Sequence, residues 1–251
     1  MSSIKSLLAD VQEASVEEAS HDMESGGGSA FINECGVYPT KILNAFLTET
    51  KKGGIKLDLM LGGDNIIDLE LYIISKKKGK MVTTCVMNGK TVSLPSYKMF
   101  KQLYFLATGE GLDLAEMKLE TKDIKYKRYG KDVEVEGDVI TAMIGKEIQV
   151  GIRLEEDYNY EDGEVDKTSL KTNKDGDVIY SRELHSVFSK DGFSPVEVIG
   201  EAEEAKDVEE VKKFLASDKA IKRVKLEFPD EEEGEDGSDI DAEAEDDEIK
   251  F

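Results

Sequence analysis

Cationic and aromatic side chains alternate closely in residues 122–131, which read KDIKYKRYGK. Holding a flexible single-stranded nucleic acid requires cations along its phosphates and flat rings on which its bases can stack. This segment supplies both, so it predicts a single-strand contact on an extended hairpin; an ordinary surface hairpin with solvated lysines is the alternative. The candidate residues are Lys122, Lys125, Tyr126, Lys127, Arg128, Tyr129 and Lys131.

Two other lysine clusters fall at predicted turns or strand starts. The first holds Lys51, Lys52 and Lys56, and the second holds Lys76, Lys77, Lys78 and Lys80. The second cluster is at the tip of a predicted strand pair, where small β-barrels carry binding loops. Tyr72 is predicted on the face opposite Leu69 and Leu71, where it lines an outer groove with Lys56 or packs under a loop.

The acidic C-terminus is the most specific feature of the sequence. Residues 230–251 hold thirteen acids and one lysine, so they cannot bury enough apolar area to fold and are expected to stay extended. The chain then ends in an aromatic ring beside the terminal carboxylate, a compact handle for an apolar pocket with a basic rim. The same polyanion can occupy a basic groove of its own chain; a plain solubility segment is the alternative. The partner-binding candidates are Asp246, Asp247, Glu248, Ile249 and Phe251.

The charge of the remaining chain is bipolar. The net charge of the 251 residues is −22, and the part before residue 230 keeps 42 acids and 32 bases. Acids concentrate in residues 155–166 and 201–210, away from the lysine clusters.

No arrangement of residues predicts catalysis, a metal or a cofactor. Cys35 and Cys85 lie far apart in the sequence, and with His21 and His185 they fit no zinc-ligand spacing. No apolar run approaches the ~20 residues needed to cross a bilayer, and the N-terminus lacks a secretory pattern. We therefore expect a cytoplasmic protein that is not an enzyme and does not bind membranes.

Periodicity and turn residues predict the elements. A period of two over 55–61, 67–74 and 82–86 indicates antiparallel strands with one buried face. In 67–74 the odd-numbered residues from Ile67 to Ile73 are predicted on the buried face, and the even-numbered residues up to Ile74 on the outer face. Glycine-containing turns separate these strands, and Asn88-Gly89 is a strong hairpin signal. A helix is expected from Pro95 to Ala107.

More strands and two short helices are expected after this helix. The strands are predicted at 133–135, 148–154, 178–180 and 224–228, and the helices at a capping box from Ser194 and at about 208–216. The chain divides into an N-terminal arm with a glycine-rich hinge (1–29), a folded domain (30–229) and the acidic tail (230–251). The order predicts a mainly β fold, an OB-fold-like antiparallel barrel with a helix inserted after the third or fourth strand and short C-terminal helices. A β-sandwich with peripheral helices is the alternative.

In these features the chain resembles bacteriophage single-stranded DNA-binding proteins, in which an OB-fold core precedes an acidic tail ending in an aromatic residue. The resemblance rests on the tail, the strand order of 37–228, and the phrases at 144–150 and 183–188. It implies a core that coats single-stranded DNA during replication, recombination and repair. It also implies that Phe251 and the acids before it contact the replicative DNA polymerase and the helicase or primase. For a bacteriophage protein, the expected site of action is the host cytoplasm.

Two other classes of function stay open. An acidic DNA mimic or chaperone-like protein would bind a basic protein partner and have no affinity for oligonucleotides. A nuclease would use surface acids such as Glu155 and Glu156 with magnesium. The sequence does not distinguish a monomer from a homodimer.

Overall fold

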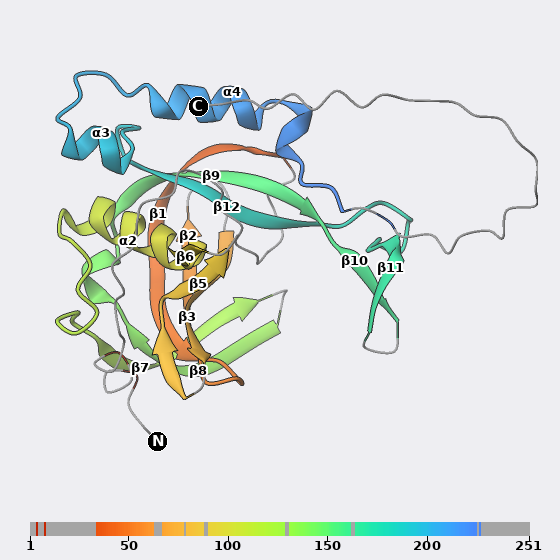
Figure 1. The fold of residues 1–251 in the computed structure, drawn as a ribbon, viewed down its shortest axis with the longest axis horizontal. Coiled ribbons are helices and arrows are strands. Elements are labelled where there is room, and N and C mark those ends of the chain that lie inside the picture. Colours follow the sequence, from red (N-terminus) through yellow and green to blue (C-terminus); the bar gives the residue numbers. More distant parts are fainter. Residues whose placement is uncertain are drawn as a thin grey trace, which may run out of the picture.

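The computed structural model describes residues 4, 8, 34–62, 67–77, 79–87, 90–128, 131–161, 164–224 and 226. Of these, the side chains of 87, 126–128, 131–133, 160, 161 and 164 are not described. The protein is mainly β, with an eight-stranded antiparallel sheet, two separate hairpins and a few helices (Figure 1).

The alternation over 55–61 and 67–74 correctly predicted two strands, whereas the strand predicted at 82–86 is divided between the main sheet, up to Val82, and a separate hairpin, from Thr84. Four consecutive strands form an antiparallel meander. They are β1 (Gly36–Glu49), β2 (Ile55–Gly62), β3 (Ile67–Lys77) and β4 (Lys80–Val82). Gly53 and Gly79, in the β1–β2 and β3–β4 turns, have φ angles of 77° and 79°. Glycine reaches this region without a Cβ penalty.

A β-bulge in β3 changes the face on which its last residues lie. The β2–β3 register passes from Lys56↔Tyr72 to Ile55↔Ile74, so Ile73 is the extra residue. Ile73 and Ile74 are both buried in the core, whereas Tyr72 is exposed. The prediction that Ile74 lies on the outer face was therefore wrong, because simple alternation makes no room for an inserted residue.

Strands distant in sequence complete the sheet. Its order is β12-β9-β1-β2-β3-β4, with β8 pairing with both β1 and β7. The end strands β4 and β12 do not pair with each other, so the sheet curves without closing. This architecture is consistent with an OB-type barrel and confirms the predicted fold class. The further strands of the sheet are β7 (Glu120–Arg128), β8 (Lys131–Val139), β9 (Glu147–Glu156) and β12 (Tyr180–Ser189).

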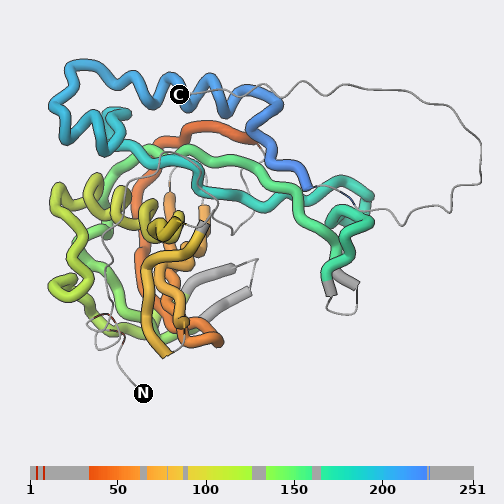
Figure 2. The backbone as a smooth tube through the Cα atoms, in the orientation of Figure 1, coloured from red at the N-terminus to blue at the C-terminus, as the bar shows by residue number. Residues whose placement is uncertain are grey.

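Two hairpins stand apart from the main sheet. β5 (Thr84–Met87) pairs with β6 (Lys90–Ser93) in a hairpin that ends at the Met87↔Lys90 pair, and the predicted turn residues Asn88 and Gly89 lie outside the described residues. β10 (Tyr158–Glu161) pairs with β11 (Glu164–Leu170), and together they project from the body (Figure 2). The acidic segment of residues 155–166 thus continues β9 into this hairpin.

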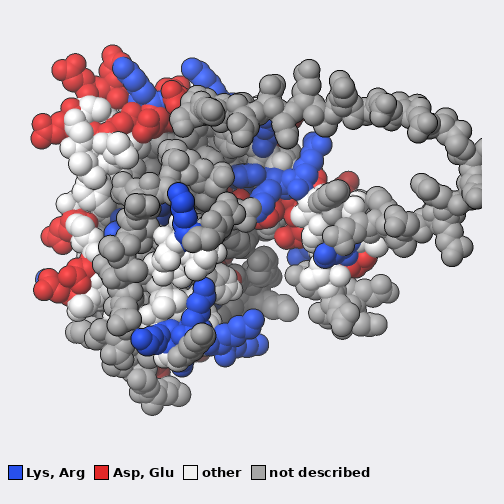
Figure 3. Space-filling view, in the orientation of Figure 1, with Lys and Arg blue, Asp and Glu red and all other residues white. Residues whose placement is uncertain are grey.

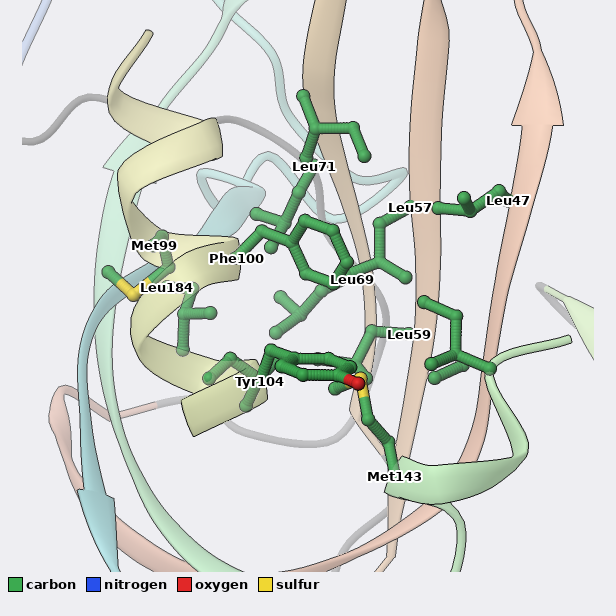
Figure 4. Close-up of a cluster of buried hydrophobic side chains, with 14 of the residues drawn as sticks. Leu47, Leu57, Leu59, Leu69, Leu71, Met99, Phe100, Tyr104, Met143 and Leu184 are labelled. Carbon is green, nitrogen blue, oxygen red and sulfur yellow. The ribbon is translucent and has the colours of Figure 1, made fainter. Parts of the chain in front are cut away.

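The main core lies between the sheet and helix α2 (Pro95–Thr108). Proline at the first helical position starts the helix, and Gly109, with a φ of 77°, ends it. Its apolar stripe points to the sheet: Phe100 and Tyr104 lie against leucines of β2 and β3, and Leu184 of β12 lies beside Met99 (Figure 4). Full burial of such side chains contributes roughly 1.5–3 kcal/mol each.

Two short helices follow β12: the first contacts β12 and α2, and the second covers β1 and β9 on the face opposite α2. They are α3 (Pro195–Ile199) and α4 (Asp207–Leu215). Gly151 alternates with the core residues Val150 and Ile152, so it faces away from α2, and a Cβ there would lie 3.4 Å from Leu215 of α4. The glycine therefore makes room for Ser186 of β12, whose Oγ that Cβ would overlap, while the distance to Leu215 is an ordinary van der Waals contact. Two 3₁₀ turns are also present, η1 (Thr141–Met143) and η2 (Asp218–Ala220).

Some details of the order differ from the sequence-based expectation. Helix α2 follows six strands rather than three or four. Val224 and Leu226 are not in a strand; the described segment there forms one parallel bridge, between Lys222 and Glu155. Phe228 lies outside the described residues. In the predicted N-terminal arm, Leu8 is buried in the main core. Among the described residues, no helix has the length and apolarity required to cross a membrane.

Candidate nucleic-acid interface

Two lysine clusters meet at one end of the sheet. In an antiparallel meander the β1–β2 and β3–β4 turns lie at the same end, about 10 Å apart across two strand spacings. A Cβ built on Gly53 would lie 3.2 Å from the Lys76 Nζ, so this lysine reaches over the first turn. We name this group the lysine end, and Figure 3 shows its cations together at the bottom of the molecule. Its members are the exposed residues Lys51, Lys52, Lys76, Lys77 and Lys80.

Backbone hydrogen bonds hold the first of these turns. The amide of Thr50 donates to the Gly54 carbonyl at 2.8 Å, and the Gly54 amide donates to the Thr50 Oγ1 at 3.0 Å. A Cβ on Gly54 would lie 2.6 Å from the Ile74 carbonyl oxygen, so the turn packs directly on β3. The turn therefore presents Lys51 and Lys52 from a fixed backbone.

The charge of the lysine end is not balanced by pairing. None of its five ammonium groups forms an ion pair with another residue in the part of the chain that the structure describes. One carboxylate is close, because Glu49 Oε1 would lie 3.7 Å from a Cβ on Gly53. Cations gathered at one place repel one another, and an anion placed among them lowers that energy.

Lys56 lies in a different environment. Its Nζ donates to Asp58 Oδ1 at 2.9 Å and contacts the Glu70 carboxylate, and the side chain is only 20% exposed. Burial would lower the pKa of Lys56, but the hydrogen bonds to Glu70 and Asp58 outweigh it and raise the pKa. Lys56 is therefore held between two carboxylates and is not part of the lysine end, although the sequence grouped it with Lys51 and Lys52.

An acidic row accompanies Lys56 on the outer face of the meander. The register sets Asp58 opposite Glu70 and Met60 opposite Asp68. Burial raises the pKa of Asp58, although hydrogen bonds from Lys56 and from Thr48 Oγ1, the latter 2.8 Å long, lower it. We name Asp58, Asp68 and Glu70 the acidic row, which was not predicted from the sequence. Antiparallel pairing of the polar positions on β2 with those on β3 was the signal that could have found it.

Tyr72 is the exposed aromatic residue of this face. Its side chain is 54% exposed, and it pairs in register with Lys56. Lys76 is four positions further along β3, a distance of roughly 13 Å. Tyr72 therefore lies between the acidic row and the lysine end, and its ring does not pack under a loop.

The β7–β8 hairpin joins the sheet near the lysine end. β8 pairs with β1 at Phe46↔Val139, five residues before Lys51, and Ile124 packs with these two side chains. Lys122 contacts Glu120 at 2.5 Å and Lys125 contacts Glu134 at 2.9 Å, with all four side chains more than half exposed. Such surface pairs are typically worth under ~1 kcal/mol, so a phosphate can replace the carboxylate.

The structure describes the other predicted DNA-binding and partner-binding residues only in part. The backbones of Tyr126, Lys127 and Arg128 lie in β7, and that of Lys131 lies in β8. Lys78 and Tyr129 lie outside the described residues, as do the tail residues proposed to bind partners. The tail residues are Asp246, Asp247, Glu248, Ile249 and Phe251.

Within the described ranges, no group of three His, Cys, Asp or Glu side chains is arranged to hold a metal ion. Cys35 and Cys85 are both free thiols. Comparison of the chain with protein-family profiles, with curated proteins and with solved structures finds no match.

Proposed function

We propose that the protein is a non-catalytic single-stranded DNA-binding protein acting in bacteriophage DNA replication, recombination and repair. The observation that carries the proposal is the meeting of lysines from two turns at the lysine end. In a chain of net charge −22, cations gathered at one place, with no ion pair to any residue that the structure describes, point to an anionic ligand. Their spread over two neighbouring turns suits an extended polyanion better than a single small anion.

Two neighbouring features favour a single strand over a duplex. Tyr72 exposes a ring on which an unpaired base can stack, and the β7–β8 hairpin adds the exposed Lys122 and Lys125. The acidic row repels phosphates from the middle of the outer face. The polynucleotide would therefore cross the end of the sheet, from the lysine end towards the hairpin, rather than follow the strands.

The acidic tail has two roles in the proposed function, competition with DNA and recruitment of partners. Residues 230–251 carry a net charge of −12 and can compete with DNA for the lysine end. The terminal Phe251 and the acids before it would recruit the replicative DNA polymerase and the helicase or primase when DNA displaces the tail. The proposed site of action is the cytoplasm of the host cell.

The test measures binding of a labelled oligothymidylate of about 15 nucleotides by fluorescence anisotropy at several salt concentrations. Removing two phosphate-contacting lysines should reduce the slope of log K against log salt by about 1.4, since each contact contributes ~0.7. The variants are Lys51→Ala/Lys52→Ala and Lys76→Ala/Lys77→Ala. The matched control is Lys212→Ala/Lys213→Ala, an exposed lysine pair on α4.

The proposal fails if the lysine-end variants keep the slope and affinity of the unmodified chain, or if the control loses as much. The same measurement on a chain ending at residue 229 separates the role of the tail. There the affinity should rise, because the competing polyanion is gone. Unchanged affinity would remove the competition from the proposal while leaving the lysine end in place.

A second candidate function is supported by the acids over α3 and α4. Residues 194–217 hold seven acids and three lysines, a surface suited to a basic protein. If this surface were the main site, the protein would act as a DNA mimic or chaperone-like protein. Absence of oligonucleotide binding even without the tail would favour that function.

A further inference from the structure

Helix α3 presents apolar side chains to solvent. Val196 is 74% exposed, Ile199 is 71% exposed and Val198 is 40% exposed, and no residue of the helix is buried. Val196 and Ile199 are three residues apart, so they lie on one face of the helix. We name these three residues the α3 patch.

The patch is held on a fixed backbone rather than on a loose loop. Ser194 and Glu197 form a complete capping box at the start of α3. The Glu197 carboxylate also accepts hydrogen bonds from the amides of Lys206 at 2.6 Å and Asp207 at 3.0 Å, which begin α4. Burial would raise the pKa of Glu197, but the amide hydrogen bonds outweigh it and lower the pKa. A surface fixed in this way loses little conformational entropy when it binds.

Acidic side chains surround the patch. Figure 3 shows uncharged atoms over α3 at the upper left, with acidic atoms around them. Lys206 pairs with Glu204 and Lys212 with Glu209, which balances only part of the negative charge. The exposed acids are Glu201, Glu203, Glu204, Glu209 and Glu210.

This charge excludes several occupants of the patch. A second copy docked about a twofold axis would bring the same acids face to face. The chain's own tail and a polynucleotide are both polyanions, so both are repelled. The remaining occupant that satisfies the apolar side chains and the acids together is a basic, amphipathic one.

We propose that the α3 patch docks a basic amphipathic segment of a partner protein. Apolar side chains of that segment cover Val196 and Ile199, and its lysines or arginines pair with the acids of residues 201–210. The site lies at the opposite end of the molecule from the lysine end (Figure 2), so the protein can hold this partner and a polynucleotide at the same time. The inference does not depend on the proposed DNA binding.

The test uses a labelled peptide of about 18 residues made of leucine and lysine, with the leucines spaced to form one helix face. Its binding to the full chain, without DNA, is measured by fluorescence anisotropy. The variant Val196→Ser/Ile199→Ser removes the apolar contacts without changing any charge, so binding to the acidic tail is unaffected. The matched control is Val86→Ser, since Val86 is 69% exposed on the separate β5–β6 hairpin.

We expect the patch variant to bind the peptide at least about fivefold more weakly, while the control binds like the unmodified chain. A peptide of the same composition with scrambled leucines should not distinguish the patch variant from the unmodified chain. The proposal is overturned if the amphipathic peptide does not bind, or if the patch variant keeps full affinity. It is also overturned if sedimentation velocity shows a dimer that the patch variant dissociates. Unchanged circular dichroism checks that both variants fold.

Discussion

Lys56 is predicted to stabilise the fold rather than to bind a ligand. Its Nζ lies between Asp58 and Glu70, whose side chains are only 9% and 17% exposed. The substitution Lys56→Met removes the ammonium group that contacts both of these partly buried carboxylates. Breaking a fully buried pair costs ~3–5 kcal/mol, and the remaining solvent contact here reduces the expected loss of unfolding free energy to about 2–3 kcal/mol.

The measurement is urea unfolding followed by far-UV circular dichroism. The control is Lys125→Met, because Lys125 pairs with Glu134 on the surface, where both side chains are more than half exposed. That pair should contribute under ~1 kcal/mol. If Lys56→Met destabilised the protein no more than Lys125→Met, the ion cluster on the outer face would not exist in solution.

The loss of stability in Lys56→Met should also depend on pH, in a direction set by the pKa of Asp58. Burial already raises the pKa of Asp58 above its ordinary value of 3.8, and losing the cation should raise it further. A carboxyl whose folded-state pKa is raised takes up its proton in the folded chain first, so it favours folding at low pH and loses this contribution as pH rises through the raised pKa. The stability deficit of Lys56→Met should therefore shrink as pH falls through the raised pKa of Asp58 towards its ordinary value of 3.8. A deficit that is constant with pH would contradict this account.

Two further predictions concern the lysine end and its neighbour. Gly54→Ala places a Cβ 2.6 Å from the Ile74 carbonyl oxygen and should destabilise the protein by roughly 1–3 kcal/mol in urea unfolding. Gly111→Ala, where nothing lies within 4 Å, should have little effect, and equal losses would contradict the packed turn. Tyr72→Ala should weaken oligothymidylate binding by ~1–3 kcal/mol in anisotropy titrations, while Tyr72→Phe keeps most of the affinity because the stacking ring remains. If the phenylalanine variant lost as much as the alanine variant, base stacking would not be the role of Tyr72.

Elements that depend on neighbouring residues could be predicted from the sequence. A period of two predicted the strands β2 and β3, and Gly79 predicted a turn between β3 and β4. The capping box at Ser194 gave the start of α3. Each follows from backbone geometry and hydrogen bonding within a few residues, so no knowledge of the rest of the chain is needed.

The tertiary structure decided which of the lysines are available to a ligand. The sequence grouped Lys56 with Lys51 and Lys52, but pairing of β2 with β3 sets it between Asp58 and Glu70. The bulge at Ile73 and the pairing of β1 with β8 and β9 were likewise outside the reach of local patterns. The sequence by itself determined the residue types, the local elements and the acidic tail. Which charges meet, and which cancel, depends on the register between strands, because that register is set by the burial of the whole core and not by any one segment.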